Sequence, residues 1–386
     1  MMDVIIIGEH LYNTLGQVRC FGEMGIRPIV IWATRSVYTP AFSRYVRQFF
    51  QAMDPEDGVR LMFAQFGNKG QRYVVSTDSD HVMSILDREY DSLSGSFCFF
   101  NAGGTGRLSR YLEKYEQCAL AKELGLRVPK TWKVRSGMIP EDISFPVFAK
   151  AADSLDYHWK DLTRIIRSRE ELRAYYDSIP PVNVLLQDYI EKKNEMAVEG
   201  VSFHGGRELY LPIQGEYLRL PEDGFGTFKK NEAYKAGEKL KETLRQLMMN
   251  VGYSGIFETE FLVGPDDTLY YLETNFRQTQ YNHALADMGA NLSRVWYRSC
   301  LSGRLETDSE SIRKSPSLVL NEPKDYKTYV ETGKIGKWTW LKDVVKADSY
   351  YFLDRKDWPY VLRSFLHSVR LNTVAFFRRL RRRAGL

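Results

Sequence analysis

Residues 252–278 read GYSGIFETEFLVGPDDTLYYLETNFRQ, and this stretch predicts a β-hairpin. Apolar and β-branched residues fill 256–263, which is the composition of a strand. The tetrapeptide 264–267, Gly-Pro-Asp-Asp, has turn chemistry, and 268–275 returns as a second strand. The rest of the chain can be interpreted around this hairpin.

Alternation of side chains along the two strands places four polar residues on one face of the hairpin. They are Glu258, Glu260, Glu273 and Asn275. The other face is expected to carry Phe257, Phe261, Tyr270 and Leu272. A four-residue loop would pair Val263 with Thr268, Glu260 with Tyr271, and Glu258 with Glu273. Three carboxylates at cross-strand distance repel one another, so such a face either stays in solvent or holds a hard cation such as Mg²⁺. The hairpin alone leaves both interpretations open.

The hairpin resembles the metal-binding end of the ATP-grasp superfamily, whose members commonly have a Glu at the end of one strand and Glu-x-Asn-x-Arg on the next. Glu260, Glu273, Asn275 and Arg277 match those positions. The resemblance implies that the first three bind Mg²⁺, or Mn²⁺, beside ATP and that Arg277 is catalytic. Phe276 stands where the family often has Pro, which leaves the metal ligands unchanged.

Two lysines resemble the pair that reaches the nucleotide phosphates in this superfamily. Lys114 opens a predicted helix that is followed by Val-Pro-Lys-Thr, and Lys150 ends the strand Phe-Pro-Val-Phe-Ala-Lys. The resemblance implies that both bind phosphate and that Lys150 also stabilises charge on the transferring phosphoryl group. The loop that follows, 151–160, lacks the usual glycines, so Ser154, His158 or Lys160 is expected to contribute a side-chain contact to the phosphates.

The segment 184–191, Val-Leu-Leu-Gln-Asp-Tyr-Ile-Glu, resembles the hinge that holds the adenine ring in the family. The resemblance implies nucleotide binding at four hinge residues and at an acidic residue that takes the ribose hydroxyls. These residues are Gln187, Asp188, Tyr189, Ile190 and Glu195. The alternative is an ordinary edge strand with exposed acidic residues.

Substrate contacts are expected just after Arg277, as in family members, at Gln278, Tyr281 and His283. A single histidine is more often structural than functional. Arg219, in a glycine-containing segment that resembles a loop over the site, is a further candidate for a substrate contact, with Lys229 as the alternative.

The first part of the chain, 1–108, predicts a small doubly wound α/β domain. A buried strand at 3–8, a helix from Leu11 and a second strand at 28–32 make a βαβ start. The glycines do not form GxGxxG, which argues against nicotinamide or flavin binding. Similar domains precede the ATP-grasp core in related ligases, where Asp78 would lie near the substrate.

Composition indicates an ordinary globular protein of 386 residues, long enough for two or three domains or lobes. The four cysteines, at 20, 98, 118 and 300, have neither zinc spacing nor the density of a disulfide framework, which favours a reducing cytoplasm. The N-terminus does not resemble a signal peptide, and no apolar run approaches the roughly 18 residues of a membrane span.

The C-terminal segment predicts an amphipathic helix at about 358–383 that ends in a run of arginines. Such a helix either lies on an anionic membrane surface or docks on the protein with a solvated basic tail; the arginines favour the membrane. Nucleic acid is not favoured, because aromatic stacking residues are not interleaved with the charge.

Together these motifs predict an α/β fold: a Rossmann-like domain (1–108), a two-lobed α+β ATP-grasp core (109–303, with a nucleotide lobe at about 130–190), and a C-terminal segment (304–386). The resemblance implies a carboxylate-amine ligase that uses Mg-ATP and an acyl phosphate, closest in appearance to D-aspartate ligases acting on envelope precursors. The alternatives are a non-catalytic nucleotide-binding regulator at the membrane and an ATP-grasp phosphotransferase. The sequence fixes neither the substrates nor the oligomeric state.

Overall fold

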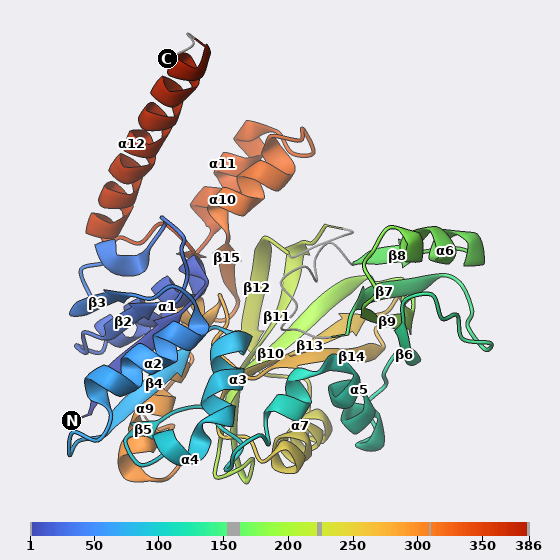
Figure 1. Ribbon diagram of the computed structural model, residues 1–386, viewed down its shortest axis with the longest axis horizontal. Helices are drawn as coiled ribbons and strands as arrows, with labels where there is room; N and C mark the ends of the chain where they lie inside the picture. Colours follow the sequence, from blue (N-terminus) through green and yellow to red (C-terminus); the bar gives the residue numbers. More distant parts are fainter. Residues whose placement is uncertain (1, 153–162, 222–225, 309, 384–386) are drawn as a thin grey trace.

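The computed structural model describes residues 2–152, 163–221, 226–308 and 310–383, without side chains at 151 and 371–383. It has a mixed α/β fold with three β-sheets, which confirms the predicted fold class (Figure 1). One sheet belongs to the N-terminal part, a large sheet forms the centre, and a small sheet forms a separate lobe on the right of Figure 1.

The N-terminal sheet has five parallel strands in the order β3-β2-β1-β4-β5. Its strands are β1 (Asp3–Gly8), β2 (Ile29–Trp32), β3 (Gln48–Gln51), β4 (Tyr73–Thr77) and β5 (Phe97–Cys98). The helices are α1 (Leu11–Gly22), α2 (Pro55–Phe66), α3 (Asp80–Arg88) and α4 (Tyr90–Leu93). Parallel strands joined by helices bring the carboxyl ends of β1 and β4 to the same edge of the sheet. Close to this edge, Asp80 forms an ion pair with Arg277, which follows the hairpin of the large sheet. Ser79 caps α3 by accepting a hydrogen bond from the Val82 amide, which fixes the start of that helix.

The large sheet has seven strands in the order β14-β13-β10-β11-β12-β15-β16. Their bounds are β10 (Asn194–Phe203), β11 (Glu208–Arg219), β12 (Phe228–Ala233), β13 (Gly255–Val263), β14 (Leu269–Asn275), β15 (Ser317–Leu320) and β16 (Ser349–Tyr350). Helices α7 (Glu238–Val251), α8 (Asn282–Met288) and α9 (Leu292–Ser302) complete this part. One apolar core runs from β1 to α9, so the large sheet and the N-terminal sheet are packed as one body.

The small lobe is a four-stranded sheet in the order β6-β9-β7-β8. Its elements are β6 (Thr131–Arg135), β7 (Val147–Ala151), β8 (Arg164–Ile166), α6 (Arg169–Asp177) and β9 (Asn183–Asp188), preceded by α5 (Lys114–Glu123). One face of the sheet packs with α6 in a core that includes Val147, Ala149 and Leu172. Because side chains alternate along β7, Lys150 lies on the opposite face.

The register of the β13–β14 hairpin differs from the predicted one. Val263 pairs with Leu269 instead of Thr268, because five residues rather than four connect the strands. A bulge between Glu260 and Phe261 adds a further shift, so that Glu260 pairs with Glu273 and Glu258 with Asn275. The total shift is even, so the four predicted polar residues still share one face.

The same bulge corrects the prediction for the apolar face. Phe261 pairs with Tyr271, and both side chains are buried with their ring centroids 6.1 Å apart. Tyr270 and Leu272, which we expected on the apolar face, are only partly buried. The extra residue lies in β14 between the polar site and the turn. On the turn side of it, the side chains of β14 therefore point to the opposite faces from those predicted.

The C-terminal segment, which gave weak sequence signals before residue 358, supplies β15 and β16 to the large sheet. It also contains α10 (Glu322–Asp325), a π-helical turn (Tyr326–Val330), α11 (Lys337–Lys346) and α12 (Trp358–Arg383). Helices α11 and α12 stand at the upper edge of the molecule in Figure 1. None of the helices, over their described residues, is both long and apolar enough to cross a membrane.

Cysteines 98 and 300 form a disulfide that joins β5 to α9 across 202 residues of sequence. Cysteine spacing gave no indication of this pair, because the two residues become neighbours only through the packing of the N-terminal sheet against α9. Cys20 and Cys118 are buried free cysteines.

Candidate functional site

Carboxylates gather on one face of the large sheet where β10, β13 and β14 lie side by side. Glu199, Glu258 and Asn275 occupy one row of cross-strand partners, and Glu260 and Glu273 occupy the next. Asn275 Nδ2 donates hydrogen bonds to Glu260 Oε1 at 3.0 Å and to Glu258 Oε2 at 3.4 Å. Strand pairing therefore brings together the three residues that the hairpin motif predicted as metal ligands.

The two predicted phosphate-binding lysines reach this face from the small lobe and from α5. Lys114 Nζ lies 2.7 Å from Glu273 Oε2. Lys150 is almost fully buried, and burial together with the positive charge of Lys114 lowers its pKa to about 8. Two ammonium groups held this close repel each other, so the site is well suited to a polyanion that lies between them.

Charge repulsion also acts among the clustered carboxylates. Burial, together with the charges of Glu258 and Glu273, raises the pKa of Glu260 well above its usual value. Burial acts in the same direction on Glu273, but Lys114 and Lys150 outweigh it and hold the pKa of Glu273 at about 2. A set of oxygen donors in which Glu260 resists ionisation without a neighbouring cation fits a hard divalent cation.

Arg277 connects the hairpin to the N-terminal domain. Its Nε and Nη2 donate to the two carboxylate oxygens of Asp80 at 2.9 and 3.0 Å, and Nη2 also donates to Asn275 Oδ1 at 3.0 Å. The guanidinium is thus fixed beside the predicted ligand set by a bidentate pair. Asp78, which is expected near the substrate, accepts hydrogen bonds from the amides of Glu9 and His10, and so orders the loop before α1.

A second, buried polar group adjoins the carboxylates on the same face. Lys229 Nζ lies 3.2 Å from Glu199 Oε1 and 3.8 Å from Glu258 Oε1, and 3.7 Å from the ring centroid of Tyr281. Burial raises the pKa of Glu199 to about 7 despite the charge of Lys229. Tyr281, one of the predicted substrate contacts, is therefore part of the site, with its hydroxyl 2.6 Å from that of Tyr217.

Asn231 lies two residues along β12 from Lys229 and points to the same face. Its side chain is fully buried, and neither its Nδ2 nor its Oδ1 has a hydrogen-bond partner among the described residues. Gly215, its cross-strand partner, leaves the space that it needs, since a Cβ there would lie 2.2 Å from Asn231 Oδ1. A buried amide without partners is costly unless a ligand or water completes its hydrogen bonds.

The predicted adenine hinge lies at the end of β9. Gln187 shares the face of Lys150 but donates to Thr131 Oγ1 at 2.9 Å. The amides of Asp188 and Tyr189 donate to Lys130 and Pro146 at 2.9 and 3.2 Å. Those two amides are thus used within the lobe, so the predicted adenine contact at these residues would have to use other backbone groups. Ile190 follows the strand and is partly buried.

Glu195 lies on β10, on the sheet face that carries the cluster of carboxylates. Its charge also raises the pKa of Glu260, but less than burial and the charges of Glu258 and Glu273 do. Lys192 Nζ lies 2.9 Å from Glu195 Oε1. Ser154, His158 and Lys160, the predicted phosphate contacts of the glycine-poor loop, lie outside the described residues.

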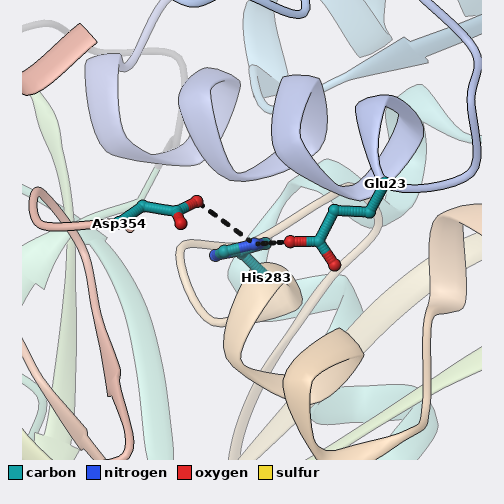
Figure 2. A group of neighbouring side chains, drawn as sticks. All are labelled: Glu23, His283 and Asp354. Atoms are coloured by element: carbon teal, nitrogen blue, oxygen red, sulfur yellow. Dashed lines mark hydrogen bonds and ion pairs between the residues drawn. The ribbon is translucent and has the colours of Figure 1, made fainter. Parts of the chain in front are cut away.

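Two predicted substrate contacts lie elsewhere. Gln278 is fully buried and donates to Ser293 Oγ at 2.8 Å, so it belongs to the packing between β4 and α9. His283 lies between Glu23 and Asp354, with Nε2 at 3.2 Å and 3.8 Å from their carboxylates (Figure 2). Both predictions are corrected, because proximity to Arg277 in sequence does not set the direction of a side chain.

The group of Glu23, His283 and Asp354 has the composition of a metal site. However, Lys356 Nζ lies 2.9 Å from Glu23 Oε1, and Arg19 Nε lies 3.3 Å from Asp354 Oδ2. These two cations already neutralise the carboxylates. We therefore interpret the group as a set of ion pairs that holds the C-terminal segment against α1.

Arg219 is also corrected as a substrate contact. Its guanidinium lies 2.8 Å from Asp325 Oδ2 and 2.7 Å from Asp343 Oδ2, and so joins β11 to the C-terminal segment. Asp325 is fully buried. An arginine that neutralises two carboxylates, one of them buried, has a structural role.

We expect Arg219→Gln to lower the free energy of unfolding by about 3–5 kcal/mol, because it leaves the buried charge of Asp325 uncompensated. Chemical denaturation followed by circular dichroism measures this loss. The matched control is Arg88→Gln, whose ion pair with Glu56 is exposed and should contribute no more than about 1 kcal/mol. Equal effects of the two substitutions would contradict the structural role of Arg219.

Sequence reasoning missed or undervalued four site residues: Glu199, Lys229, Asn231 and Asp80. Glu199 was detectable in principle, since it follows Glu195 and Ala197 at strand spacing. Nothing in the sequence places Lys229 beside Glu199 or Asp80 beside Arg277, because these contacts depend on the order of strands and on the packing of two domains.

No family model matches the chain. Among solved structures, the L-amino acid ligase from Bacillus licheniformis aligns with a TM-score of 0.61 at 15% identity, covering 78% of this chain and 74% of the ligase. The N5-carboxyaminoimidazole synthetase from Staphylococcus aureus gives 0.64 at 14% identity, covering 86% and 87%. Biotin carboxylase from Campylobacter jejuni gives 0.63 at 13% identity, covering 82% and 75%. These are ATP-grasp enzymes, and the chain shares their fold. The predicted ATP-grasp fold is thereby confirmed.

Proposed function

We propose that this ATP-grasp chain is an ATP-dependent carboxylate-amine ligase. The observation that carries the proposal is the convergence of Lys114 and Lys150 on Glu260, Glu273 and Asn275, with Arg277 beside them. Cations on one side and oxygen ligands on the other are the arrangement that a metal-bound triphosphate requires.

In this proposal Glu260, Glu273 and Asn275 hold Mg²⁺, for which Mn²⁺ could substitute. The residues fit the ion, because they gather oxygen donors on one sheet face, where burial and the charges of Glu258 and Glu273 raise the pKa of Glu260 and a bound cation would favour its ionised form. When bound, the ion would neutralise charge on the phosphate oxygens. Asn275 Nδ2 now donates to Glu260, so its amide would have to turn for Oδ1 to serve as a ligand.

ATP would lie between the small lobe and the large sheet. Its phosphates would contact Lys114 and Lys150, with Ser154 from the adjoining loop, and Glu195 would accept hydrogen bonds from the ribose. The adenine would lie near the end of β9, at Gln187 to Ile190. Since two hinge amides are already bonded within the lobe, carbonyl groups of the hinge are left to recognise the adenine amino group.

The reaction would proceed in two steps. An oxygen of the carboxylate substrate attacks the γ-phosphorus of ATP, and the bond to the bridging oxygen of ADP breaks, which gives an acyl phosphate. The amine then attacks the acyl carbon, loses a proton, and expels inorganic phosphate as the amide forms. Lys150 and Arg277 would stabilise the negative oxygens of both transition states, because Lys150 is a buried cation and Arg277 is held in place by its bidentate pair with Asp80.

An amino acid is the substrate class that this site supports best. The face next to the ligand set offers a buried cation at Lys229, carboxylates at Glu199 and Glu258, and an unpartnered amide at Asn231. Groups of both signs suit a zwitterion. The L-amino acid ligase neighbour agrees with this class, whereas action on an envelope precursor in the cytoplasm, as in D-aspartate ligases, rests on sequence resemblance alone.

The test is phosphate release from Mg-ATP with amino acids offered singly and in pairs, together with bicarbonate and peptide amines as further substrates. We expect release that requires both a carboxylate and an amine. Release that needs only a hydroxyl or a carboxylate, with the phosphoryl group retained in the product, would identify a phosphotransferase. Nucleotide binding without turnover for any pair would favour a regulator.

Nucleotide affinity should fall as the pH rises through about 8. Lys150 has its pKa lowered to about 8 in the structure, and a triphosphate would bind its charged form. The charged form predominates below that pKa, so affinity should be nearly constant there and should fall by up to about tenfold per pH unit above it. Calorimetry in buffers of different ionisation enthalpy should detect proton uptake on binding.

The variant Lys150→Met should bind ATP weakly at every pH and take up no proton through this group. Lys122→Met, at an exposed lysine of α5, is the matched control and should keep the parent pH profile. A pH profile that is the same in the parent and in Lys150→Met would contradict the contact between Lys150 and phosphate.

A further inference from the structure

Helix α12 attaches to the N-terminal domain through one face only. Tyr360 and Ser364 are buried, and His367 Nε2 lies 3.2 Å from the Val37 carbonyl oxygen, with its ring 5.5 Å from that of Phe42. The spacing of 360, 364 and 367 defines a single helix face. The first half of α12 is thus fixed in orientation by this contact.

The opposite face of α12 carries an apolar stripe exposed to solvent. Its members are 46–62% exposed and recur at the spacing of one helix face. They are Trp358, Leu362, Phe365, Leu366 and Val369. The helix therefore docks on the protein body, as one of the two alternatives predicted, but this docking leaves the stripe uncovered.

Helix α11 presents a second apolar stripe. None of its residues is buried, and Trp338 and Val345 are 81% and 84% exposed, with Leu341 between them on the same face. Both helices stand at the same upper edge of the molecule in Figure 1. Exposed apolar side chains of this size and number mark an interaction surface.

The net charge of each of these helices is positive. Residues 358–383 contain seven arginines and no acidic residue. In α11, lysines occupy 337, 342 and 346, and its one acidic residue, Asp343, is paired with Arg219. An apolar stripe flanked by cations complements a surface that is apolar within and anionic at its boundary.

We propose that α11 and α12 bind the surface of an anionic lipid bilayer, with the stripes inserted at the boundary between headgroups and acyl chains. A second copy of the chain fits less well, because each copy would bring seven arginines to the interface while α12 has no acidic residue to pair with them. Nucleic acid would neutralise the arginines but leave the apolar stripes in water. This proposal does not depend on the ligase activity.

The experiment is co-sedimentation of the full chain with vesicles of phosphatidylcholine, alone or mixed with phosphatidylglycerol. We expect binding to the mixed vesicles at least about tenfold tighter than to phosphatidylcholine alone, and weaker at high salt. The double variant Phe365→Ser with Leu366→Ser should lose about tenfold or more in affinity. Met138→Ser, at an exposed methionine of the small lobe, is the matched control and should bind as the parent does.

Circular dichroism, and phosphate release where it is detected, show whether each variant is folded. Equal binding to both kinds of vesicle, or none to either by the folded parent, would overturn the proposal. So would a double variant that binds vesicles normally. If the chain bound nucleic acid but not vesicles, the surface would be assigned to nucleic acid. If the chain bound no vesicles but formed a dimer that the double variant abolished, the surface would be assigned to a second copy.

Discussion

Glu273→Gln should reduce the rate of phosphate release by about 10²–10³-fold or more, at a magnesium concentration that saturates the parent. Glu273 contributes one of the three predicted ligands and is ion-paired with Lys114 at 2.7 Å. The substitution preserves shape while removing the charge that would hold both the metal and the lysine in position. Calorimetric titration with Mn²⁺ in the presence of a non-hydrolysable ATP analogue should show a matching loss of metal affinity.

The matched control for this variant is Glu242→Gln on α7. Glu242 forms an exposed ion pair with Arg245, far from any predicted contact with nucleotide, so its loss should leave turnover unchanged. If Glu273→Gln kept the parent rate and the parent metal affinity, the assignment of the hairpin as a metal site would be wrong.

Arg277→Lys should lower kcat by about 10²–10³-fold while changing the KM for ATP much less. A lysine keeps the positive charge but cannot form the bidentate pair that Arg277 makes with Asp80, so the charge would no longer be fixed where negative oxygens develop. Steady-state rates at saturating concentrations of both other substrates separate kcat from KM.

Two further variants sharpen this prediction. Asp80→Asn leaves the arginine in place with a weaker partner and should cost less, about tenfold in kcat. Arg88→Lys, at an exposed arginine of α3, should cost nothing. A variant Arg277→Lys that raises only the KM for ATP would place Arg277 in nucleotide binding and not in stabilisation of the transition state.

The polar face of the hairpin was predictable although its register was not. Alternation depends only on whether the shift between strands is odd or even, and a longer loop plus one bulge together gave an even shift. Glu258, Glu260, Glu273 and Asn275 therefore share a face under either register. The bulge itself has no sequence signal here, so the pairing of Phe261 with Tyr271 could not be foreseen.

Contacts between distant elements set the limit of sequence reasoning. The motifs located Lys114 and Lys150, and the structure brings both to the carboxylates. In contrast, Gln278 follows Arg277 directly and yet points into the core, where Ser293 binds it. Arg219 was assigned to substrate from its loop alone, but two aspartates more than 100 residues later neutralise it.

The C-terminal segment shows a different limit. Strands β15 and β16 have only four and two residues, too few for a hydrophobic period to emerge. They form because β12 offers an edge to β15, and β15 in turn offers an edge to β16. Helix α12, by contrast, lies where its long apolar period predicted it. Which of its faces meets the protein became clear only from Tyr360 and Ser364.

Transfer of a heavy oxygen isotope from the carboxylate substrate to inorganic phosphate tests the central proposal most directly. In an acyl phosphate the oxygen that bridges carbon and phosphorus comes from the carboxylate, and it leaves with phosphate when the amine attacks carbon. With the substrate pair that supports release, we predict one labelled oxygen in each phosphate formed, and amide product in equal amount. Phosphate that carries no label would show that water, or another nucleophile, attacks ATP, and would contradict the ligase mechanism.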